Sequence, residues 1–396
     1  MNYHISDRMA SMRPSMVREI LKATSDPSVI PFAAGNPAPN AFPVAEVQRI
    51  VGEILAERPI DALQYSITEG HPPLREALRQ LCASHYGIPM REQDDLIVLS
   101  GAQQGMDLAT KVLCNEGDTV LCEDPSFIGS LNCFRSYHVN LVGVPMEEDG
   151  ISLPALEEAL RREKNVRMLY LIPNFQNPTG ITTSLEKRRE LYRICAEAGV
   201  MILEDNPYGD LRFSGEAIPS LKSMDTEGIV IYVGSFSKIL APGVRVGWTI
   251  APKPLIAKMT VGKQCADVHT TILTQMLCER WLATCDLQAH LARLQEIYRQ
   301  KCALMLDCID REFSPKVTHT TPQGGLFLWC TLPEGADMLD FCNRAVAEKV
   351  AVVPGVAFLA DENAPCRSVR MNFSTPTDEA IVTGCQRLGR LTRELF

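Results

Sequence analysis

The stretch from Ser235 to Trp248 carries one lysine among two serines, a Pro-Gly turn and an arginine, directly after an apolar run. Lys238 can form an imine with an aldehyde when a partly desolvated site lowers the pKa of its amine. Ser235, Ser237 and Arg245 supply the donors that a phosphate dianion requires. The stretch therefore predicts covalent capture of a phosphorylated aldehyde. A strand followed by a solvated basic turn is the alternative, because clusters of serine and lysine are common.

A second candidate for phosphate binding follows the apolar run at residues 96–99. Gly101, Ala102 and Gln103 lie in a glycine-containing turn ahead of a helical pattern. Such a turn offers free backbone N–H groups and the positive end of the helix dipole to an anion. These three residues are therefore predicted to cradle the phosphate. Glycine-rich turns are frequent, so an ordinary turn is the alternative.

Two further apolar runs end in side chains that suit a planar ligand. Phe127 follows residues 119–122 and can stack on a ring, or it can pack as an ordinary core residue. Asn177 follows residues 168–172 and has prolines on both sides, which restrict the backbone and steady its amide. We expect this amide to donate to a ligand oxygen, with a plain Asn-Pro turn as the alternative.

A carboxylate ends the apolar run at residues 200–203. A charge in that place is costly unless it is paired, and a protonated ring nitrogen would be a suitable partner. We prefer Asp205 over Glu204 for this role, and Tyr208 can donate its hydroxyl to a ring oxygen. A helix cap plus an exposed acid is the alternative. Taken together, the five strand ends match one ligand, a phosphorylated pyridine aldehyde.

The elements that must position these residues alternate along the chain. Short apolar runs without polar interruption are typical of strands buried on both faces of a mostly parallel sheet, and the carboxyl ends of such strands form the binding edge. The pattern predicts an α/β large domain with a mostly parallel seven-stranded sheet covered by helices. The predicted strands are residues 96–99, 119–122, 141–144, 168–172, 200–203, 229–233 and 246–250, and the predicted helices are 104–113, 153–162 and 185–198.

The two ends of the chain differ from this middle part. A long charged helical pattern at residues 287–312 is followed by short strand patterns at 326–330, 350–353 and 368–372, which predicts a smaller α+β C-terminal domain. Four prolines between residues 31 and 43 predict an extended N-terminal strap. We expect an N-terminal helix and strap at 1–48, partly packed on the small domain, a large domain at 49–286 and a small domain at 287–396.

Composition excludes several classes of partner. The 396-residue chain has a formal net charge of -9, with 39 basic and 48 acidic residues scattered along it, so we expect neither nucleic acid nor a membrane surface as partner. We find no apolar stretch near the ~20 residues of a membrane span and no signal-peptide pattern. The 14 cysteines show no zinc-ligand spacing, which predicts no metal site and favours a reducing cytoplasm.

Nearly the whole chain resembles the fold-type I pyridoxal-phosphate-dependent aminotransferases of class I and II. The motifs are individually weak, but their order is the order of that family. Within it, Gln-Asn-Pro-Thr-Gly and Ser-Phe-Ser-Lys-x-x-x-Pro-Gly-x-Arg look most like the 2-aminoadipate, kynurenine and broad-range aminotransferases. The motifs are Gly35-Asn-Pro, Tyr65 before Gly70-His-Pro-Pro-Leu-Arg, Ser100-Gly-Ala-Gln, Asn177-Pro-Thr-Gly, Asp205-x-x-Tyr208, Ser235-x-Ser-Lys238, Arg245-x-Gly-Trp and Arg370.

The resemblance implies pyridoxal 5'-phosphate as the cofactor, held by Lys238 as a Schiff base, with the same lysine later shuttling the proton. By the same resemblance Asp205 would keep the ring nitrogen protonated, while Asn177 and Tyr208 would bond the phenolic oxygen. Phe127 would stack on the ring, although the family usually has tyrosine there. The phosphate would be held by residues of the two turns: Gly101, Ala102, Gln103, Ser235, Ser237 and Arg245.

Substrate and subunit contacts are also implied by the resemblance. Arg370 would grip the substrate α-carboxylate as a bidentate fork, with Gly35 and Asn177 nearby. Tyr65 would reach the phosphate of the other subunit, which implies a homodimer with shared active sites. Arg18, in an expected helix at residues 15–22, would approach the substrate side chain. The alternatives are a surface ion pair for Arg370, plain packing for Tyr65 and a solvated helix face for Arg18.

The predicted function is an aminotransferase of amino acid metabolism. It would move an amino group from an L-amino acid to a 2-oxo acid, with 2-oxoglutarate as the favoured acceptor, by a ping-pong mechanism. A fold-type I lyase, such as a carbon–sulfur β-lyase, shares every cofactor residue and is the first alternative. A non-catalytic regulator is disfavoured, because the sequence starts at the strap with no basic DNA-binding segment. The sequence does not predict which amino acid is the donor.

Overall fold

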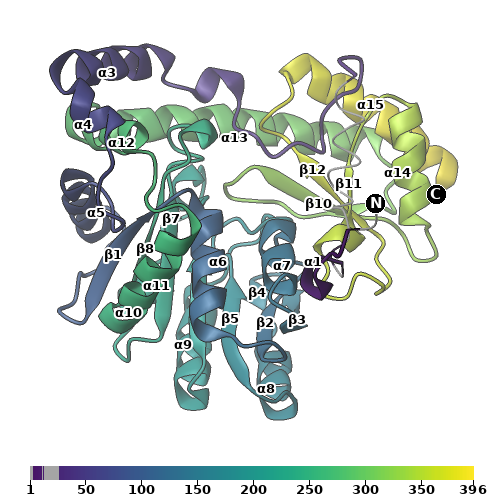
Figure 1. Cartoon of the computed structure of the whole chain (residues 1–396). Coiled ribbons are helices and arrows are strands. Elements are labelled where there is room, and N and C mark those ends of the chain that lie inside the picture. The colour runs from purple at the N-terminus through teal and green to yellow at the C-terminus, as the bar shows by residue number, and fades with distance from the viewer. Residues whose placement is uncertain (1–2, 11, 13–25) are drawn as a thin grey trace.

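The computed structural model describes residues 3–10, 12 and 26–396 (Figure 1). Among these residues, the large domain centres on a sheet of eight strands in the order β1-β8-β7-β6-β5-β2-β3-β4. The strands are β1 (Asp94–Leu99), β2 (Thr119–Asp124), β3 (Asn140–Glu147), β4 (Gly150–Ile151), β5 (Val166–Leu171), β6 (Met201–Asp205), β7 (Val230–Ser235) and β8 (Gly247–Pro252).

The sheet is mostly parallel, as predicted, and all seven predicted strands are present. The eighth, β4, was not predicted, because two residues are too short to show a hydrophobic period. β8 runs antiparallel to both β7 and β1, and Ser235 pairs with Gly247. The start of β8 therefore lies beside the end of β7. This reversal brings the turn that contains Lys238 and Arg245 to the carboxyl edge of the parallel strands.

Helices cover both faces of the sheet (Figure 1). On β5, Tyr170 packs in one apolar cluster, whereas Leu169 and Leu171 pack in a second cluster on the other face. Burial on both faces explains why the strands read as continuous apolar runs. The helices of this part are α3 (Val44–Glu57), α4 (Pro59–Leu63), α5 (Pro72–Ser84), α6 (Ala102–Leu113), α7 (Ile128–Arg135), α8 (Leu153–Arg162), α9 (Leu185–Ala198), α10 (Leu221–Met224), α11 (Lys253–Ala266) and α12 (Ile272–Thr284).

The smaller C-terminal domain contains an antiparallel sheet in the order β11-β12-β10-β9. The predicted strand at 350–353 shrinks to β11 at Val353–Pro354, because Val350 instead pairs with Ile30 of the strap. The long helix α13 extends from the large domain to the small domain (Figure 1). The elements are α13 (Leu287–Glu312), β9 (Thr318–His319), β10 (Phe327–Thr331), α14 (Met338–Ala347), β11 (Val353–Pro354), β12 (Ser368–Asn372) and α15 (Asp378–Leu395).

The N-terminal strap joins the two domains. Its backbone bonds to the small domain, where Phe32 O accepts from Asn372 N, and it then enters α3 after Pro43. The predicted boundary between residues 48 and 49 falls inside α3. Short elements complete the described part of the chain: α1 (Asp7–Ala10), η1 (Pro39–Ala41), η2 (Gly209–Leu211), η3 (Pro242–Val244) and η4 (Gly355–Phe358). In the same residues, no helix has the length and apolarity needed to cross a membrane.

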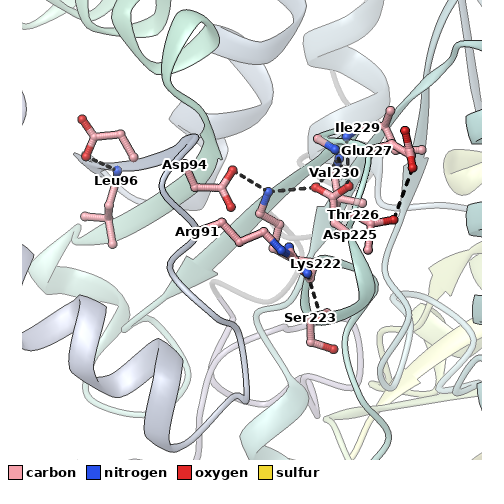
Figure 2. A network of polar contacts seen from close by, with 12 residues as sticks. Arg91, Asp94, Leu96, Lys222, Ser223, Asp225, Thr226, Glu227, Ile229 and Val230 are labelled. Carbon is pink, nitrogen blue, oxygen red and sulfur yellow. Dashed lines mark hydrogen bonds and ion pairs between the residues drawn. The ribbon is translucent and has the colours of Figure 1, made fainter.

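A buried ion network fastens the amino ends of the strands (Figure 2). Lys222 of α10 lies between Asp94 Oδ1 of β1 at 3.0 Å and Asp225 Oδ2 at 2.9 Å, and its side chain is fully buried. Asp225 Oδ1 also accepts from Gly228 N and Ile229 N ahead of β7. One cation therefore pairs with two buried carboxylates and ties β1 to the entry of β7.

Replacing Lys222 by methionine is expected to lower the free energy of unfolding by roughly 3 to 5 kcal/mol, because two buried carboxylates lose their cation. Lys111→Met is the matched control, since Lys111 forms an exposed pair with Asp107 at 3.3 Å. That pair contributes less than about 1 kcal/mol. Urea unfolding of both variants measures the difference. Equal losses would show that the buried network does not carry this stability.

Candidate active site

Most of the predicted site residues line one cavity of about 350 Å³ at the carboxyl edge of the large sheet, between the sheet and the small domain. Two larger hollows, of about 900 and 890 Å³, contain none of the predicted residues. The predicted residues around the 350 Å³ cavity are Gly35, Ala102, Gln103, Phe127, Asn177, Asp205, Tyr208, Ser235, Ser237, Lys238, Arg245 and Arg370.

Two of the predicted residues that the structure describes lie outside this lining. Gly101 lies against the guanidinium group of Arg245. Tyr65 is 81% exposed and makes an edge-to-face contact with His269, with ring centroids 5.8 Å apart. Arg18 and its expected helix fall outside the described residues.

Lys238 presents its amine to the cavity from the turn after β7. Its Nζ donates to the carbonyl of Gly35 in the strap at 2.9 Å and lies 6.0 Å from the ring centroid of Tyr208. Burial lowers the pKa of Lys238 to about 8, and the positive charges of Arg370 and Arg245 lower it in the same direction. A substantial fraction of this amine is therefore neutral near physiological pH, as a nucleophile or base requires.

Asp205 ends β6 with one oxygen bonded and one free. Tyr170 donates its hydroxyl to Oδ2 at 2.9 Å, whereas Oδ1 is buried without a partner among the described residues. Burial raises the pKa of Asp205 to about 7. Glu204 points to the other face, where it accepts from the backbone N–H groups of Leu221 and Lys222. Strand alternation thus leaves Asp205 as the acid that lines the cavity.

The end of the cavity where phosphate binding was predicted combines a helix start with an arginine. α6 begins at Ala102 without a side-chain cap, and Gln104 N already donates to Gly101 O at 3.1 Å, so the N–H groups of Ala102 and Gln103 remain available. Arg245 has a φ of 51° and donates to Pro242 O and Ser100 O at 3.1 and 3.4 Å. Gly101 has a φ of 83°, and a Cβ there would lie 2.1 Å from Arg245 Nη2. A side chain at position 101 would therefore strain the backbone and displace the Arg245 guanidinium.

Arg370 and Asn177 form the opposite wall of the cavity. Arg370 Nη1 donates to Asn177 Oδ1 at 3.1 Å, and Asn177 Nδ2 donates to the Tyr208 hydroxyl at 3.3 Å. The guanidinium carbon lies 4.3 Å from the ring centroid of Phe327, and Nε is buried without a partner in the described part of the chain. Burial lowers the pKa of Arg370 to about 10. The alternative of a surface ion pair is therefore wrong.

Several residues of the site were missed by the sequence analysis. Gln176 holds the turn that contains Asn177, because its Nε2 donates to Pro125 O at 2.7 Å and its Oε1 accepts from Thr179 N. Glu123 Oε2 accepts from Gln176 Nε2 at 3.2 Å, and burial raises the pKa of Glu123 to about 8. Its position at the end of a predicted strand was the available signal. Tyr170 gave no signal beyond its place in a strand.

Comparison with known proteins decides the family. A family model described as Aminotransferase class I and II matches residues 27–388. This chain belongs to the class I and II aminotransferases. The aminotransferase is 40% identical to a 2-aminoadipate transaminase of Thermus thermophilus over 97% of this chain and 95% of the relative. It is 38% identical to aromatic-amino-acid aminotransferase 1 of Thermococcus litoralis over 99% of this chain and 94% of the relative.

A solved structure of the family contains a derivative of the cofactor. The α-aminoadipate aminotransferase of Thermus thermophilus, complexed with N-(5'-phosphopyridoxyl)-L-leucine, superposes with a TM-score of 0.90 at 39% identity and covers 99% of this chain and 97% of its own. The cofactor of the present aminotransferase is pyridoxal phosphate. The orphaned Asp205 oxygen, the free helix start and the amine of Lys238 suit its ring nitrogen, phosphate and aldehyde respectively.

Gly101→Ala is expected to displace Arg245 and to weaken pyridoxal phosphate binding roughly tenfold or more through loss of charge-assisted donors. Gly117→Ala is the matched control, because Gly117 has a φ of 82° but nothing within 4 Å of its Cβ position. Both variants should lose roughly 1 to 2 kcal/mol of stability from the left-handed backbone. Equilibrium dialysis and urea unfolding separate the two effects. Equal cofactor affinity in the two variants would show that Arg245 does not contribute to phosphate binding.

Proposed function

We propose that this aminotransferase transfers the amino group of an L-amino acid to a 2-oxo acid, with 2-oxoglutarate as the favoured acceptor, in a ping-pong sequence. The observation that carries the proposal is one cavity in which the Lys238 amine, with its lowered pKa, faces the buried cation Arg370. The first group is suited to moving a proton and the second to holding a carboxylate. Transamination of an amino acid requires a group that moves the Cα proton and a group that holds the carboxylate in the same site.

Each residue then has a defined task. Bound pyridoxal phosphate supplies a ring that withdraws electrons from the substrate Cα. Arg370 holds the α-carboxylate, and this fixes which Cα bond faces the ring. Lys238 first binds the cofactor covalently and then, as a free amine, takes and returns the Cα proton. Asp205 keeps the ring nitrogen protonated, and Asn177 with Tyr208 holds the phenolic oxygen.

The remaining cofactor contacts are assigned to the two turns and to α7. We assign the phosphate to the donors around the start of α6 and the end of β7. Phe127 lies at the cap position of α7 and lines the cavity, which supports stacking on the ring. Phenylalanine cannot offer the hydroxyl of the tyrosine that is usual there, so stacking is its whole contribution. The phosphate ligands are Gly101, Ala102, Gln103, Ser235, Ser237 and Arg245.

For the donor, we propose aromatic and long-chain amino acids, because the relatives reported above are named for such substrates. A panel of L-amino acids at fixed 2-oxoglutarate, read as glutamate formed and as the absorbance change of the bound cofactor, tests the proposal. Turnover of at least one such donor is expected. Ammonia or thiol release without any 2-oxo acid would instead indicate a lyase, and a panel with no active donor would overturn the transaminase assignment.

The covalent uptake of pyridoxal phosphate by the apo-enzyme is expected to rise with pH and to reach half its plateau rate near pH 8. The reason is that only the neutral amine attacks a carbonyl, and the folded protein lowers the pKa of Lys238 to about 8. Borohydride trapping at several pH values measures the rate. Lys238→Ala is the control, which should bind the cofactor without trapping and lose roughly 10²- to 10⁴-fold or more in turnover. A midpoint near the ordinary lysine value of 10.5 would contradict the assignment.

We also propose a homodimer with shared active sites. Ile60, Leu63 and Tyr65 are 72%, 73% and 81% exposed, an unusual run of exposed apolar side chains. Tyr65 contacts His269, and the neighbouring Asp267 accepts from Ser100 Oγ next to the phosphate turn. A two-fold axis through this surface would place each Tyr65 at the phosphate end of the partner's cavity.

Hybrid dimers test the shared site. Lys238→Ala removes the amine, and Tyr65→Ala removes the proposed phosphate contact of the neighbouring subunit. In a hybrid of the two variants, one site keeps both an intact Lys238 and an intact Tyr65 from the other subunit. A purified hybrid is therefore expected to have about half the activity of the parent, and an equimolar mixture, in which about half of the dimers are hybrids, about a quarter, as a two-site symmetric dimer predicts. No recovery would mean that Tyr65 acts within its own subunit or outside the site.

We further propose that the enzyme works in the cytoplasm. All 14 cysteines lie in the described part of the chain and are free thiols. Most of them are buried, and burial raises the pKa of thiols such as Cys82 and Cys330 to about 12. Inert, unpaired thiols are typical of proteins that remain in a reducing compartment.

A further inference from the structure

Tyr170 lies beneath the cofactor cavity with its hydroxyl between two polar groups. The residue is fully buried on β5, and its ring meets Phe134 edge to face with centroids 5.2 Å apart. Its hydroxyl donates to Asp205 Oδ2 at 2.9 Å and accepts from Ser130 Oγ at 2.9 Å. Three elements, α7, β5 and β6, thus contribute one residue each to a chain of hydrogen bonds that ends on the carboxylate.

The direction of this chain is fixed by the chemistry of its members. When Asp205 is ionised it only accepts, so the Tyr170 proton points to Asp205, and the Ser130 proton then points to Tyr170. Hydrogen bonds in such a series polarise one another, and the effect is largest in a buried setting. Ser130 and Tyr170 are fully buried, and Asp205 is 4% exposed. The chain therefore delivers partial positive charge to one oxygen of Asp205.

The other oxygen of Asp205 has a different environment. Oδ1 is buried, has no partner among the described residues, and belongs to a residue that lines the cavity. An unpaired carboxylate oxygen in a buried place is costly, so a donor in the cavity is required. The two oxygens therefore differ in function: Oδ2 is bonded to the protein, and Oδ1 can bond to a ligand.

We propose that Tyr170, supported by Ser130, is a positioning residue that holds Asp205 as a carboxylate with its free oxygen turned to the ring nitrogen of the cofactor. The proposal rests on the proposed role of Asp205. Tyr170 touches neither the cofactor nor the substrate in this assignment. Its effect is on where one proton rests, the ring nitrogen or the carboxyl group.

Electrostatics explains why this help is needed. Burial alone disfavours the charged form and raises the pKa of Asp205, and the hydrogen bond from Tyr170 is the interaction that lowers it. Glu123, a second fully buried acid near this edge, also has a raised pKa because of burial. Without the hydroxyl, a proton shared between Asp205 and the ring would move toward the carboxyl group. An unprotonated ring nitrogen withdraws electrons less strongly.

The same helix start also positions the candidate stacking residue. Phe127 is the cap residue of α7, and its carbonyl accepts from Ser130 N at 3.0 Å. Phe127 and Ser130 both line the cavity, and the hydroxyl of Ser130 donates to Tyr170. One turn of chain therefore sets both the face on which the ring stacks and the hydrogen bonds behind its nitrogen partner.

Tyr170→Phe tests the proposal, because it removes the hydroxyl and keeps the ring packed on Phe134. Tyr232→Phe is the matched control, since Tyr232 is also fully buried in the same sheet but bonds to Asn206 Nδ2 at 2.9 Å rather than to Asp205. Ser130→Ala, which removes only the second donor, serves as a milder variant if Tyr170→Phe fails to fold.

The first readout is the pKa of Asp205 in the apo-enzyme, followed by ¹³C NMR of aspartate-labelled protein and assigned with Asp205→Asn. Tyr170→Phe should raise this pKa by about one unit or more, Ser130→Ala by less, and Tyr232→Phe should leave it unchanged. The second readout is the affinity for pyridoxamine phosphate, which binds without a covalent bond, beside its analogue with a ring carbon in place of the nitrogen. Affinity for the first should fall roughly tenfold in Tyr170→Phe, and affinity for the second should not change.

The outcomes separate this proposal from the one it rests on. If Asp205→Asn leaves the affinity for pyridoxamine phosphate unchanged, the role of Asp205 itself is wrong. If Asp205→Asn weakens binding but Tyr170→Phe alters neither the pKa of Asp205 nor the affinity, only the role of Tyr170 is overturned. If Tyr170→Phe weakens both ligands equally, or no more than Tyr232→Phe does, the residue acts through packing and the proposal is likewise overturned.

Discussion

Asp205 and Arg370 lie buried, and Lys238 half-buried, around one cavity, where a charge removed from water is costly. Burial lowers the pKa of the amine to about 8 and raises that of the carboxyl group to about 7, so the two values converge. In water the same two groups would differ by several units. The rest of the fold holds these groups in place with few protein partners, and in the proposed function the cofactor and the substrate supply the missing ones.

The sheet explains how distant residues meet at this cavity. Parallel strands bring their carboxyl ends to one edge, and the reversed strand β8 returns Arg245 to that edge beside the end of β7. Strand alternation then decides which of two adjacent acids faces the ligand, Asp205 rather than Glu204. These rules act on sequence order alone. For this reason the seven long strands and ten of the twelve predicted cavity residues could be predicted from the strand ends, whereas Gly35 and Arg370 were predicted only from the family resemblance.

The rest depends on pairings that sequence order does not contain. Tyr170 reads as an apolar strand residue. Its hydrogen bond with Ser130 of α7 joins two residues that are 40 positions apart in the chain, so it depends on how the chain folds. Gln176 looks like part of a turn, yet its bonds to Glu123 and Pro125 fix the amide of Asn177. The strand β4 is too short to show a hydrophobic period in the sequence. Tyr65 is exposed in this chain, and its proposed contact needs a second copy of the chain, which sequence order does not contain.

The strap shows how the charged groups of the site are balanced before a substrate arrives. Ala33 O and Ala34 O accept from Arg370 Nη2 at 2.8 and 3.2 Å, and Gly35 O accepts from Lys238 Nζ at 2.9 Å. Three consecutive carbonyl groups thus face the two cations. A carbonyl carries only a partial charge, whereas a carboxylate carries a full one and matches the guanidinium fork. In the proposed function, the carboxylate of an amino acid therefore pairs better with Arg370 than the strap carbonyls do, and this difference would favour its binding at a buried cation.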